Sequence, residues 1–188
     1  MLRRIRPGCQ IAGLVLGIAV LAAAAVFPRL TAEELTAQSK VIVQGTVVRS
    51  WAAWDSEHKY IWTHYQISLG DVIRGGRATT FTVSEPGGTL DGITQVNTGA
   101  IAYRSGETDI LFLAQMPNGY WRAAGGPQGK FVIEANGRVR GGAQGAALAD
   151  RFGRTATGTA LPSLDGLTVA QFKTRVRQLA AAHPFQGQ

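Results

Sequence analysis

Tyr60-Ile-Trp-Thr-His-Tyr-Gln-Ile-Ser-Leu69 is the segment that decides the fold, because its side chains alternate between two faces. One face takes Ile61, Thr63, Tyr65, Ile67 and Leu69, and the other takes Tyr60, Trp62, His64, Gln66 and Ser68. Such period-two alternation of β-branched and aromatic residues predicts a half-buried strand. A second strand-like run, Val41-Ile-Val-Gln-Gly-Thr-Val-Val48, precedes it, and the polar residues 49–59 are enough to reverse the chain. We therefore expect a hairpin onto which later strands pack.

Further strand-length runs follow this hairpin and are bounded by glycine or proline. They are Thr79–Ser84, Asp109–Ala114, Tyr120–Ala124, Lys130–Glu134 and Arg138–Arg140. The near-continuous apolar run Asp109–Ala114 should be the most buried of them. No long helices alternate with these strands, which argues against a doubly wound parallel sheet. The sequence thus predicts a mainly β domain over residues 30–140, a small antiparallel barrel that is closed or partly closed, with an open sandwich as the alternative.

Helix signals flank the predicted strands on both sides. Thr31-Ala-Glu-Glu34 matches a capping box and predicts a short helix over residues 32–38. Thr168-x-x-Gln171 is a second capping box, and an apolar stripe of amphipathic-helix spacing follows it at Val169, Phe172, Val176 and Leu179. We expect this helix, within residues 164–183, to dock on the barrel, with a binding segment for a partner as the alternative. Residues 141–163 lack periodicity, so they are predicted to be a glycine- and alanine-rich linker.

The amino-terminal residues carry a targeting signal. Met1-Leu-Arg-Arg-Ile-Arg6 is basic, the run 11–26 is apolar, and small residues occupy positions 22–25 near the end of that run. Residues 1–26 are therefore interpreted as a secretory signal peptide, with a retained membrane anchor as the alternative. Without Arg3, Arg4 and Arg6 the formal charge of +7 becomes +4. We expect an exported protein, periplasmic or extracellular, that is able to associate with the membrane through this segment.

The 188-residue chain has one cysteine, Cys9, which precedes the apolar run. It is not a lipoprotein acylation site, because that cysteine follows the apolar region. The remainder of the chain has no thiol, which excludes disulfides, thiolate metal sites and a cysteine nucleophile.

The order of several motifs adds a resemblance to a known family. The motifs are Leu35-Thr-Ala-Gln-Ser-Lys40, Val41-Ile-Val-Gln-Gly-Thr-Val47, Ile67-x-x-Gly-Asp-Val-Ile-Arg-Gly75, Glu85-Pro-Gly-Gly88 and Gly106-Glu-Thr-Asp-Ile-Leu-Phe-Leu113. Over Leu30 to Ile133 the chain resembles cysteine-poor bacterial exported domains similar to the netrin-like, OB-type barrel of tissue inhibitors of metalloproteinases. This resemblance implies a five-stranded OB-type barrel with a helix packed against it. Those inhibitors chelate zinc through an amino-terminal cysteine, and the predicted mature chain lacks one, so their mechanism is not implied.

Catalytic signatures are missing from the sequence. There is no Gly-x-Ser-x-Gly elbow, and no glycine-rich run is followed by Lys-Ser/Thr at the start of a helix. Glu107 and Asp109 are interpreted as part of a turn and the start of a strand. We therefore predict a non-enzymatic protein without a cofactor. A metal-dependent alternative would use Asp55, His58 and His64, although their spacing matches no zinc motif.

Aromatic residues crowd the predicted hairpin. The candidate binding patch comprises Trp51, Trp54, Tyr60, Trp62 and His64, with His64 expected on a solvent-facing surface. Exposed aromatic clusters mark binding sites, whereas the same loop could instead plug one end of the barrel. We predict an envelope or extracellular protein partner. A polyanion partner, bound by the carboxy-terminal arginines, is the alternative, and export argues against nucleic acid.

Overall fold

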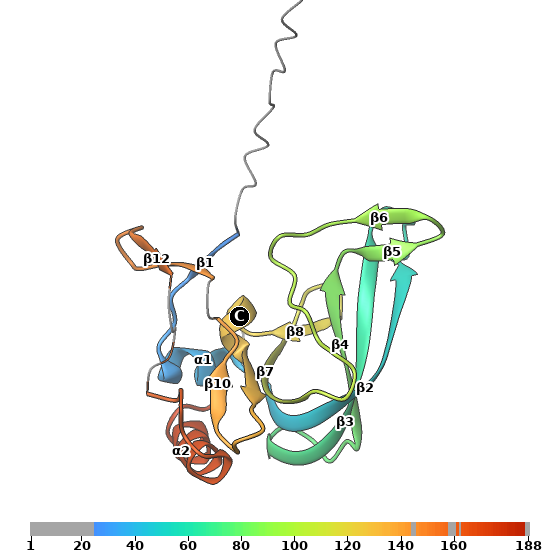
Figure 1. Ribbon diagram of the computed structural model, residues 1–188. Helices are drawn as coiled ribbons and strands as arrows, with labels where there is room; N and C mark the ends of the chain where they lie inside the picture. Colours follow the sequence, from blue (N-terminus) through green and yellow to red (C-terminus); the bar gives the residue numbers. More distant parts are fainter. Residues whose placement is uncertain (1–24, 144–145, 158–160, 162, 187–188) are drawn as a thin grey trace, which may run out of the picture.

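The computed structural model describes residues 25–143, 146–157, 161 and 163–186, and its framework is one large antiparallel sheet (Figure 1). The seven-stranded sheet has the order β10-β9-β7-β2-β3-β4, with β8 paired to β7. Its strands are β2 (Val41–Trp54), β3 (Ile61–Arg74), β4 (Thr80–Pro86), β7 (Thr108–Gln115), β8 (Trp121–Ala123), β9 (Lys130–Ile133) and β10 (Val139–Gly141). The smaller elements are β1 (Val26–Pro28), α1 (Ala32–Gln38), β5 (Gly88–Leu90), β6 (Ile93–Gln95), the 3-10 helix η1 (Gly126–Gly129), β11 (Ala147–Ala149), β12 (Thr155–Thr157) and α2 (Val169–Ala182).

The predicted hairpin is present as β2 and β3, each 14 residues long. The register places Trp51 opposite His64 and Trp54 opposite Ile61. A register shift between Val47 and Arg49 divides β2 into two halves. The first half also pairs with β7, up to Thr46. The second half projects beyond β7 and pairs with β3, which itself pairs with β4 there. We call this half and the part of β3 opposite it the arm (residues 49–54 and 61–66).

The mainly β composition is confirmed, but the sheet is not closed into a barrel. Within the described part of the chain no ladder joins β4 to β10, the two ends of the strand order. Strand β8 lies against β4 without pairing to it. Figure 1 shows the segment between β6 and β7 crossing the concave side of the curled sheet. We call residues 96–107 the strap; its Ile101 and Tyr103 are buried in the concave core.

The opposite side of the sheet is covered by the helices, as expected for a docked carboxy-terminal helix. Both predicted capping boxes form, at Thr31 with Glu34 and at Thr168 with Gln171. The buried stripe of α2 lies against the sheet, with the Phe172 ring 4.9 Å from that of Phe131 between centroids. The apolar residues of this side form one core cluster.

Arg74, near the end of β3, ties both helices to the sheet. Its guanidinium donates to the carbonyl oxygens of Thr36 and Ser39 at the end of α1 and of Ala180 and His183 at the end of α2, at 2.6, 3.2, 2.6 and 2.6 Å respectively. The last carbonyls of a helix have no partner within the helix, and its carboxy terminus carries partial negative charge. One cation therefore satisfies two helix ends.

The predicted linker, residues 141–163, proves to be part of the folded body where the structure describes it. Strand β11 pairs in parallel with β1 and antiparallel with β12. Leu148 and Leu161 are buried in the core beneath the helices. The linker prediction was wrong because strands of three residues are too short to produce periodicity in the sequence. Residues 144–145, 158–160 and 162 lie outside the description.

The predicted leader lies almost wholly outside the described residues, which begin at Ala25. The last residue assigned to it, Val26, belongs to β1 and pairs with Ala147. Among the helices that the structure describes, none is long and apolar enough to cross a membrane.

Candidate functional site

Three of the predicted patch residues meet on one face of the arm. Trp51 stacks on His64 with 5.3 Å between ring centroids, and Trp62 lies beside His64 on the same strand face. Tyr120, from the turn between β7 and β8, joins them in edge-to-face packing, with its ring centroid 4.8 Å from that of Trp62 and 5.4 Å from that of His64. We call Trp51, Trp62, His64 and Tyr120 the aromatic face. Tyr120 could not be assigned to it from the sequence, because it comes from a turn distant along the chain.

His64 is not the solvent-facing residue that strand parity predicted. Only 8% of it is exposed, because the rings of Trp51 and Tyr120 cover it. Its Nδ1 lies 2.8 Å from Oγ of Ser84 on the neighbouring strand β4. Burial lowers the pKa of His64, so the imidazole is neutral at pH 7. The centre of the aromatic face is thus uncharged.

The remaining patch residues lie elsewhere. Trp54 stacks on His58 at 6.4 Å, near the tip of the arm. Tyr60 is 62% exposed, and no ring contact joins it to the aromatic face in the described structure. The predicted patch therefore divides into a packed cluster and a more exposed tip. Trp51 does not plug an end of the sheet, as the alternative would require, because it is 36% exposed on a strand that extends beyond β7.

Asp55, His58 and His64, which the metal-dependent alternative would use as ligands, each contact a different part of the structure. Oδ1 of Asp55 accepts the backbone N–H groups of Lys59 and Tyr60, at 2.7 and 3.2 Å, and thereby holds the hairpin turn. His58 stacks on Trp54, while His64 bonds Ser84. In the part of the chain that the structure covers, no group of three or more His, Cys, Asp or Glu side chains is placed to hold a metal ion.

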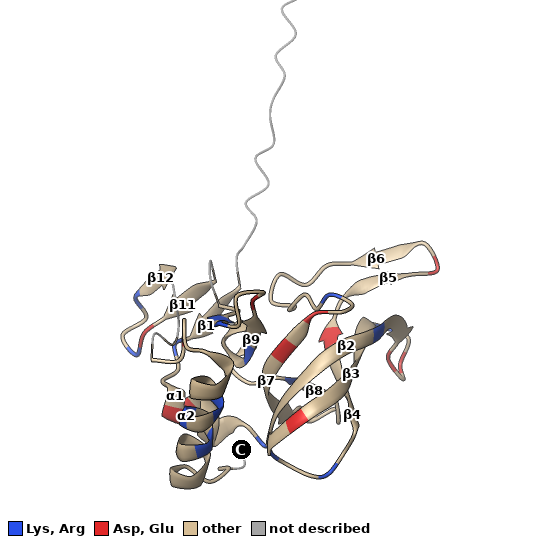
Figure 2. Cartoon of the chain, turned by 60° about the horizontal axis from the view of Figure 1, so that its bottom comes forward, with Lys and Arg blue, Asp and Glu red and all other residues tan. Residues whose placement is uncertain are grey.

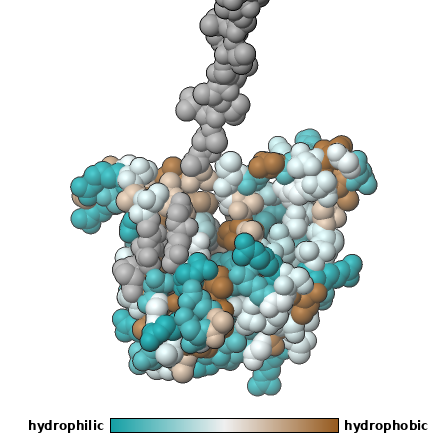
Figure 3. Space-filling model, in the orientation of Figure 1, coloured by the Kyte–Doolittle hydropathy of each residue, from teal (hydrophilic) through white to brown (hydrophobic). Residues whose placement is uncertain are grey.

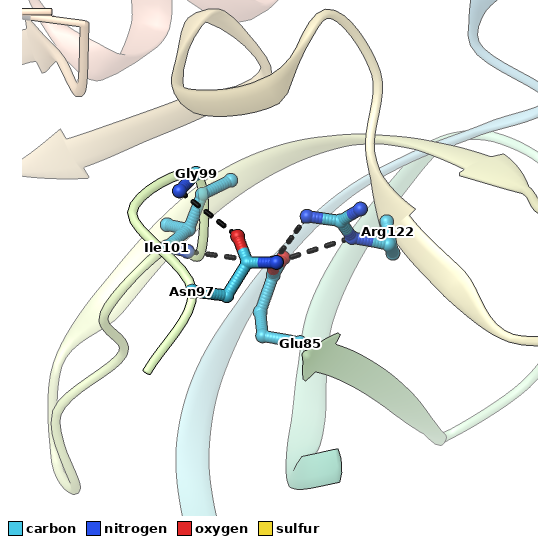
Figure 4. A network of polar contacts seen from close by, with 5 residues as sticks. All are labelled: Glu85, Asn97, Gly99, Ile101 and Arg122. Carbon is cyan, nitrogen blue, oxygen red and sulfur yellow. Dashed lines mark hydrogen bonds and ion pairs between the residues drawn. The ribbon is translucent and has the colours of Figure 1, made fainter. Parts of the chain in front are cut away.

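A second unusual region is the charged interior beneath the strap. Glu85 on β4 is 1% exposed, and its Oε2 accepts from Nη2 of Arg122 at 2.8 Å and from the backbone N–H of Ile101 at 3.3 Å (Figure 4). Arg122 comes from β8, so this ion pair joins β4 to β8 where no ladder does. Burial raises the pKa of Glu85 despite the neighbouring arginine.

Lys130, from β9, organises the other end of this interior. Its Nζ lies 3.0 Å from Glu107 Oε2 and 3.4 Å from Asp109 Oδ2, and it donates to the Ala102 carbonyl at 2.8 Å. Burial raises the pKa of Asp109 to about 7. Sequence reasoning placed Glu107 and Asp109 in an ordinary turn and strand start. The structure has both features, with Glu107 closing a turn with Arg104 and Asp109 at the start of β7. Their shared lysine could not be predicted, because it comes from a strand distant in sequence.

The interior polar groups are only partly satisfied. Glu85 Oε1, both carboxylate oxygens of Asp109 and the Tyr103 hydroxyl are buried without a hydrogen-bond partner among the described residues. Burial raises the pKa of Tyr103 well above its ordinary value, with the negative charges of Glu85 and Asp109 acting in the same direction. Such groups cost free energy, so this interior is not arranged for stability alone. Some of its contacts join strands of the sheet, and others, to Ile101, Ala102 and Glu107, hold the strap across it.

The surface also has a groove, which borders the turn that carries Tyr120, and exposed apolar residues on the β5–β6 hairpin. A groove of about 840 Å³ runs between the end of α1, the β7–β8 turn and the carboxy-terminal segment, and its lining includes Phe27, Lys40, Met116, Arg122 and Phe185. Figure 3 shows apolar residues over the β5–β6 hairpin, where Ile93 is exposed, as is Val96 just beyond it. Neither region gathers titratable groups suited to catalysis.

The basic residues of α2 that the polyanion alternative invoked are partly neutralised. Figure 2 shows lysines and arginines along α2. Nζ of Lys173 and Nη2 of Arg177 pair with the same oxygen of Asp71, at 3.0 and 2.9 Å. The positive charge of this helix is therefore reduced on the side that meets β3.

Comparison with known proteins adds no assignment. No protein-family model matches the chain, and no curated protein matches its sequence. The resemblance to netrin-like barrels remains a prediction.

Proposed function

We propose that this protein is an exported, non-enzymatic binding module that contacts a protein partner in the cell envelope through its aromatic face. The observation that carries the proposal is the packing of Trp51, Trp62 and Tyr120 around a neutral His64 on a projecting arm. Aromatic rings bury much surface at little cost in conformational entropy, and they are enriched among the residues that dominate binding energy. The leader-like residues 1–26 support export.

The surroundings of the aromatic face favour specific recognition over plain adhesion. The Arg49 guanidinium lies 5.1 Å from the centroid of the Trp51 ring, which provides a donor for a partner carboxylate or carbonyl beside an apolar surface. His64 and Ser84 are fixed by their mutual hydrogen bond, so these side chains lose little conformational entropy on binding.

We also assign the curled sheet to the OB type, as the resemblance implies. The assignment is supported by β2, β3 and β4 following one another as a meander, with β7 returning beside β2 and β8 lying against β4. OB folds bind ligands on the face of their second and third strands and with the loops after the first and fourth. In this assignment the second and third strands are β3 and β4, and the two loops are the arm tip and the turn that carries Tyr120. The ligand-binding region of an OB fold therefore coincides with the aromatic face.

A capture experiment with matched variants tests the proposal. The double variant Trp51→Ala/Trp62→Ala should lose the proteins that immobilised wild-type protein retains from an envelope fraction. Phe152→Ala, which truncates an exposed ring distant from the arm in the fold, should retain them. Thermal melting of each variant checks that it is folded. Identical partner sets for the double variant and the wild type would remove the aromatic face from the function, and a steep loss of binding with added salt would favour the polyanion alternative.

A further inference from the structure

The outer edge of the arm is an unpaired strand edge. Strand β7 leaves β2 after Thr46, and Val47 makes the last backbone bonds on that side, donating to Glu107 and accepting from Gly106 at 3.0 and 2.8 Å. Beyond this point no described strand pairs with the outer edge of β2. Figure 1 shows the end of β2 as the outermost strand of the curled sheet.

The direction of the backbone groups along this edge follows from the hairpin turn. The backbone N–H of Asp55 donates to the Tyr60 carbonyl at 2.8 Å, so Asp55 directs its polar groups toward β3. Successive residues of a strand direct their N–H and C=O groups to opposite edges, so Ser50, Ala52 and Trp54 direct theirs outward. No described residue bonds these outward groups.

The edge of β2 in the arm is less protected than the edge of β4 on the other side of the hairpin. Strand β4 ends in Pro86, which has no N–H, and β8 lies against it. The arm edge of β2 has no proline, and its small residues Ser50, Ala52 and Ala53 leave the backbone accessible. Natural proteins cover or interrupt exposed edges because these pair readily with other strands. An edge left open in this way is suited to a pairing partner.

We propose that the partner at this edge is a second copy of the same chain, paired antiparallel with β2 so that Ala52 lies opposite Ala52 of the second copy. In this register Ser50 lies opposite Trp54 of the second copy. Each outward-facing residue then meets another outward-facing residue and exchanges both hydrogen bonds with it. A shift of the register by two residues in one direction places Trp54 opposite the bulge of the second copy. A shift in the other direction places Ser50 opposite its hairpin turn.

Charge and size also agree with this register. Arg49 lies opposite Asp55 of the second copy, so opposite charges meet at both ends of the paired segment. Trp51 lies opposite Ala53, so a large side chain meets a small one. An unrelated peptide would need to supply these features independently, whereas the arm supplies both halves itself.

The pairing doubles the aromatic face. The two-fold axis of antiparallel strands in this register is perpendicular to the sheet, so side chains opposite one another lie on the same side. The Trp51 rings of the two copies therefore share one surface, and a partner with two matching sites gains avidity. This dimer goes beyond the proposed function, because it forms without any partner protein.

Cysteine cross-linking of the full chain tests the register directly. In a Cys9→Ser background, Ala52→Cys places two thiols opposite each other at a separation that a disulfide spans. The matched control is Ala53→Cys, since in the proposed register Ala53 lies opposite Trp51 and not opposite itself. We expect a disulfide-linked dimer with Ala52→Cys and none with Ala53→Cys. Equal cross-linking of the two variants, or none in either, would overturn the register.

Charge reversal and light scattering supply independent measurements. Arg49→Glu in the Ala52→Cys chain should abolish the cross-linked band, whereas Arg77→Glu, the same charge change at an exposed site off the arm, should leave it. Light scattering of the wild type should give the mass of two chains, and Ala52→Pro, which removes an outward N–H and no bond to β3, should give that of one. A single-chain mass for the wild type would refute the dimer while leaving partner capture by the aromatic face intact.

Discussion

The two sides of the large sheet differ in what they bury. The helix side packs Phe112, Phe131 and Phe172 together, and its cation Arg74 is only partly buried, at the ends of the two helices. The concave side encloses Glu85 and Asp109 with their basic partners beneath the strap. Both sides belong to the same strands, so the difference arises from what covers each side.

The helix side mainly stabilises the fold, whereas the concave side positions the strap. Apolar burial on the helix side stabilises the protein by about 25 cal/mol for each Å² removed from water. On the concave side, the desolvation of Glu85 and Asp109 offsets much of what their pairing contributes. Their polar contacts determine where the strap lies, since Ile101 and Ala102 both bond this network.

The largest expected effect comes from the helix side. Phe172→Ala removes a fully buried ring that contacts Phe112 and Phe131, and it should lower the free energy of unfolding by about 3–5 kcal/mol. Arg175→Ala, an exposed site on the same helix, should change it by less than about 0.5 kcal/mol. Urea unfolding of both variants measures the difference. A loss under about 1 kcal/mol for Phe172→Ala would mean that α2 is not part of the core.

A smaller loss is expected when the concave ion pair is broken. Arg122→Met leaves the buried carboxylate of Glu85 without its cation and should cost roughly 2–3 kcal/mol, less than for a fully enclosed pair because Arg122 is partly exposed. Adding Glu85→Gln removes the charge but keeps an acceptor for Ile101, so the double variant should recover part of this loss. Additive losses in the double-mutant cycle would show that the two side chains do not interact.

The last expected effect is a dependence on pH, which is the smallest of the three over any single pH unit. Asp109 has its pKa raised by burial from 3.8 to about 7, so between about pH 4 and pH 7 the folded protein binds a proton that the unfolded chain does not. The free energy of unfolding should therefore fall as pH rises through this range, by up to about 1.4 kcal/mol per pH unit. Asp109→Asn should remove this slope, whereas Asp91→Asn, at an exposed turn, should not. If the free energy of unfolding of Asp109→Asn depends on pH as strongly as that of the wild type, the pH dependence arises from another group.

Local signals in the sequence predicted the elements well. The hairpin of β2 and β3 follows from alternation, and the starts of α1 and α2 follow from their capping boxes. These features depend on residues within a few positions of one another. The strands β11 and β12 were missed because each is held by pairing with its neighbours in the fold and not by its own pattern.

The candidate site was predicted only in part, for a related reason. Alternation placed Trp62 and His64 on one strand face and Trp51 nearby, but it could not show that rings would cover His64. Tyr120 reaches the site through the pairing of β7 with β8, and no local pattern links it to His64. Burial depends on what packs on top of a residue, and that is decided by contacts between distant segments.

The sequence by itself determined which segments become strands and helices and which strand faces are apolar, because these properties follow from backbone preference and side-chain spacing within short stretches. Only the tertiary structure decided that the sheet stays open, that Glu85 reaches Arg122 and Asp109 reaches Lys130, and that the outer edge of β2 has no described partner. Each of these depends on where the chain returns after a long excursion. The free energy of such contacts comes from burial and pairing between remote residues, which spacing along the chain does not encode.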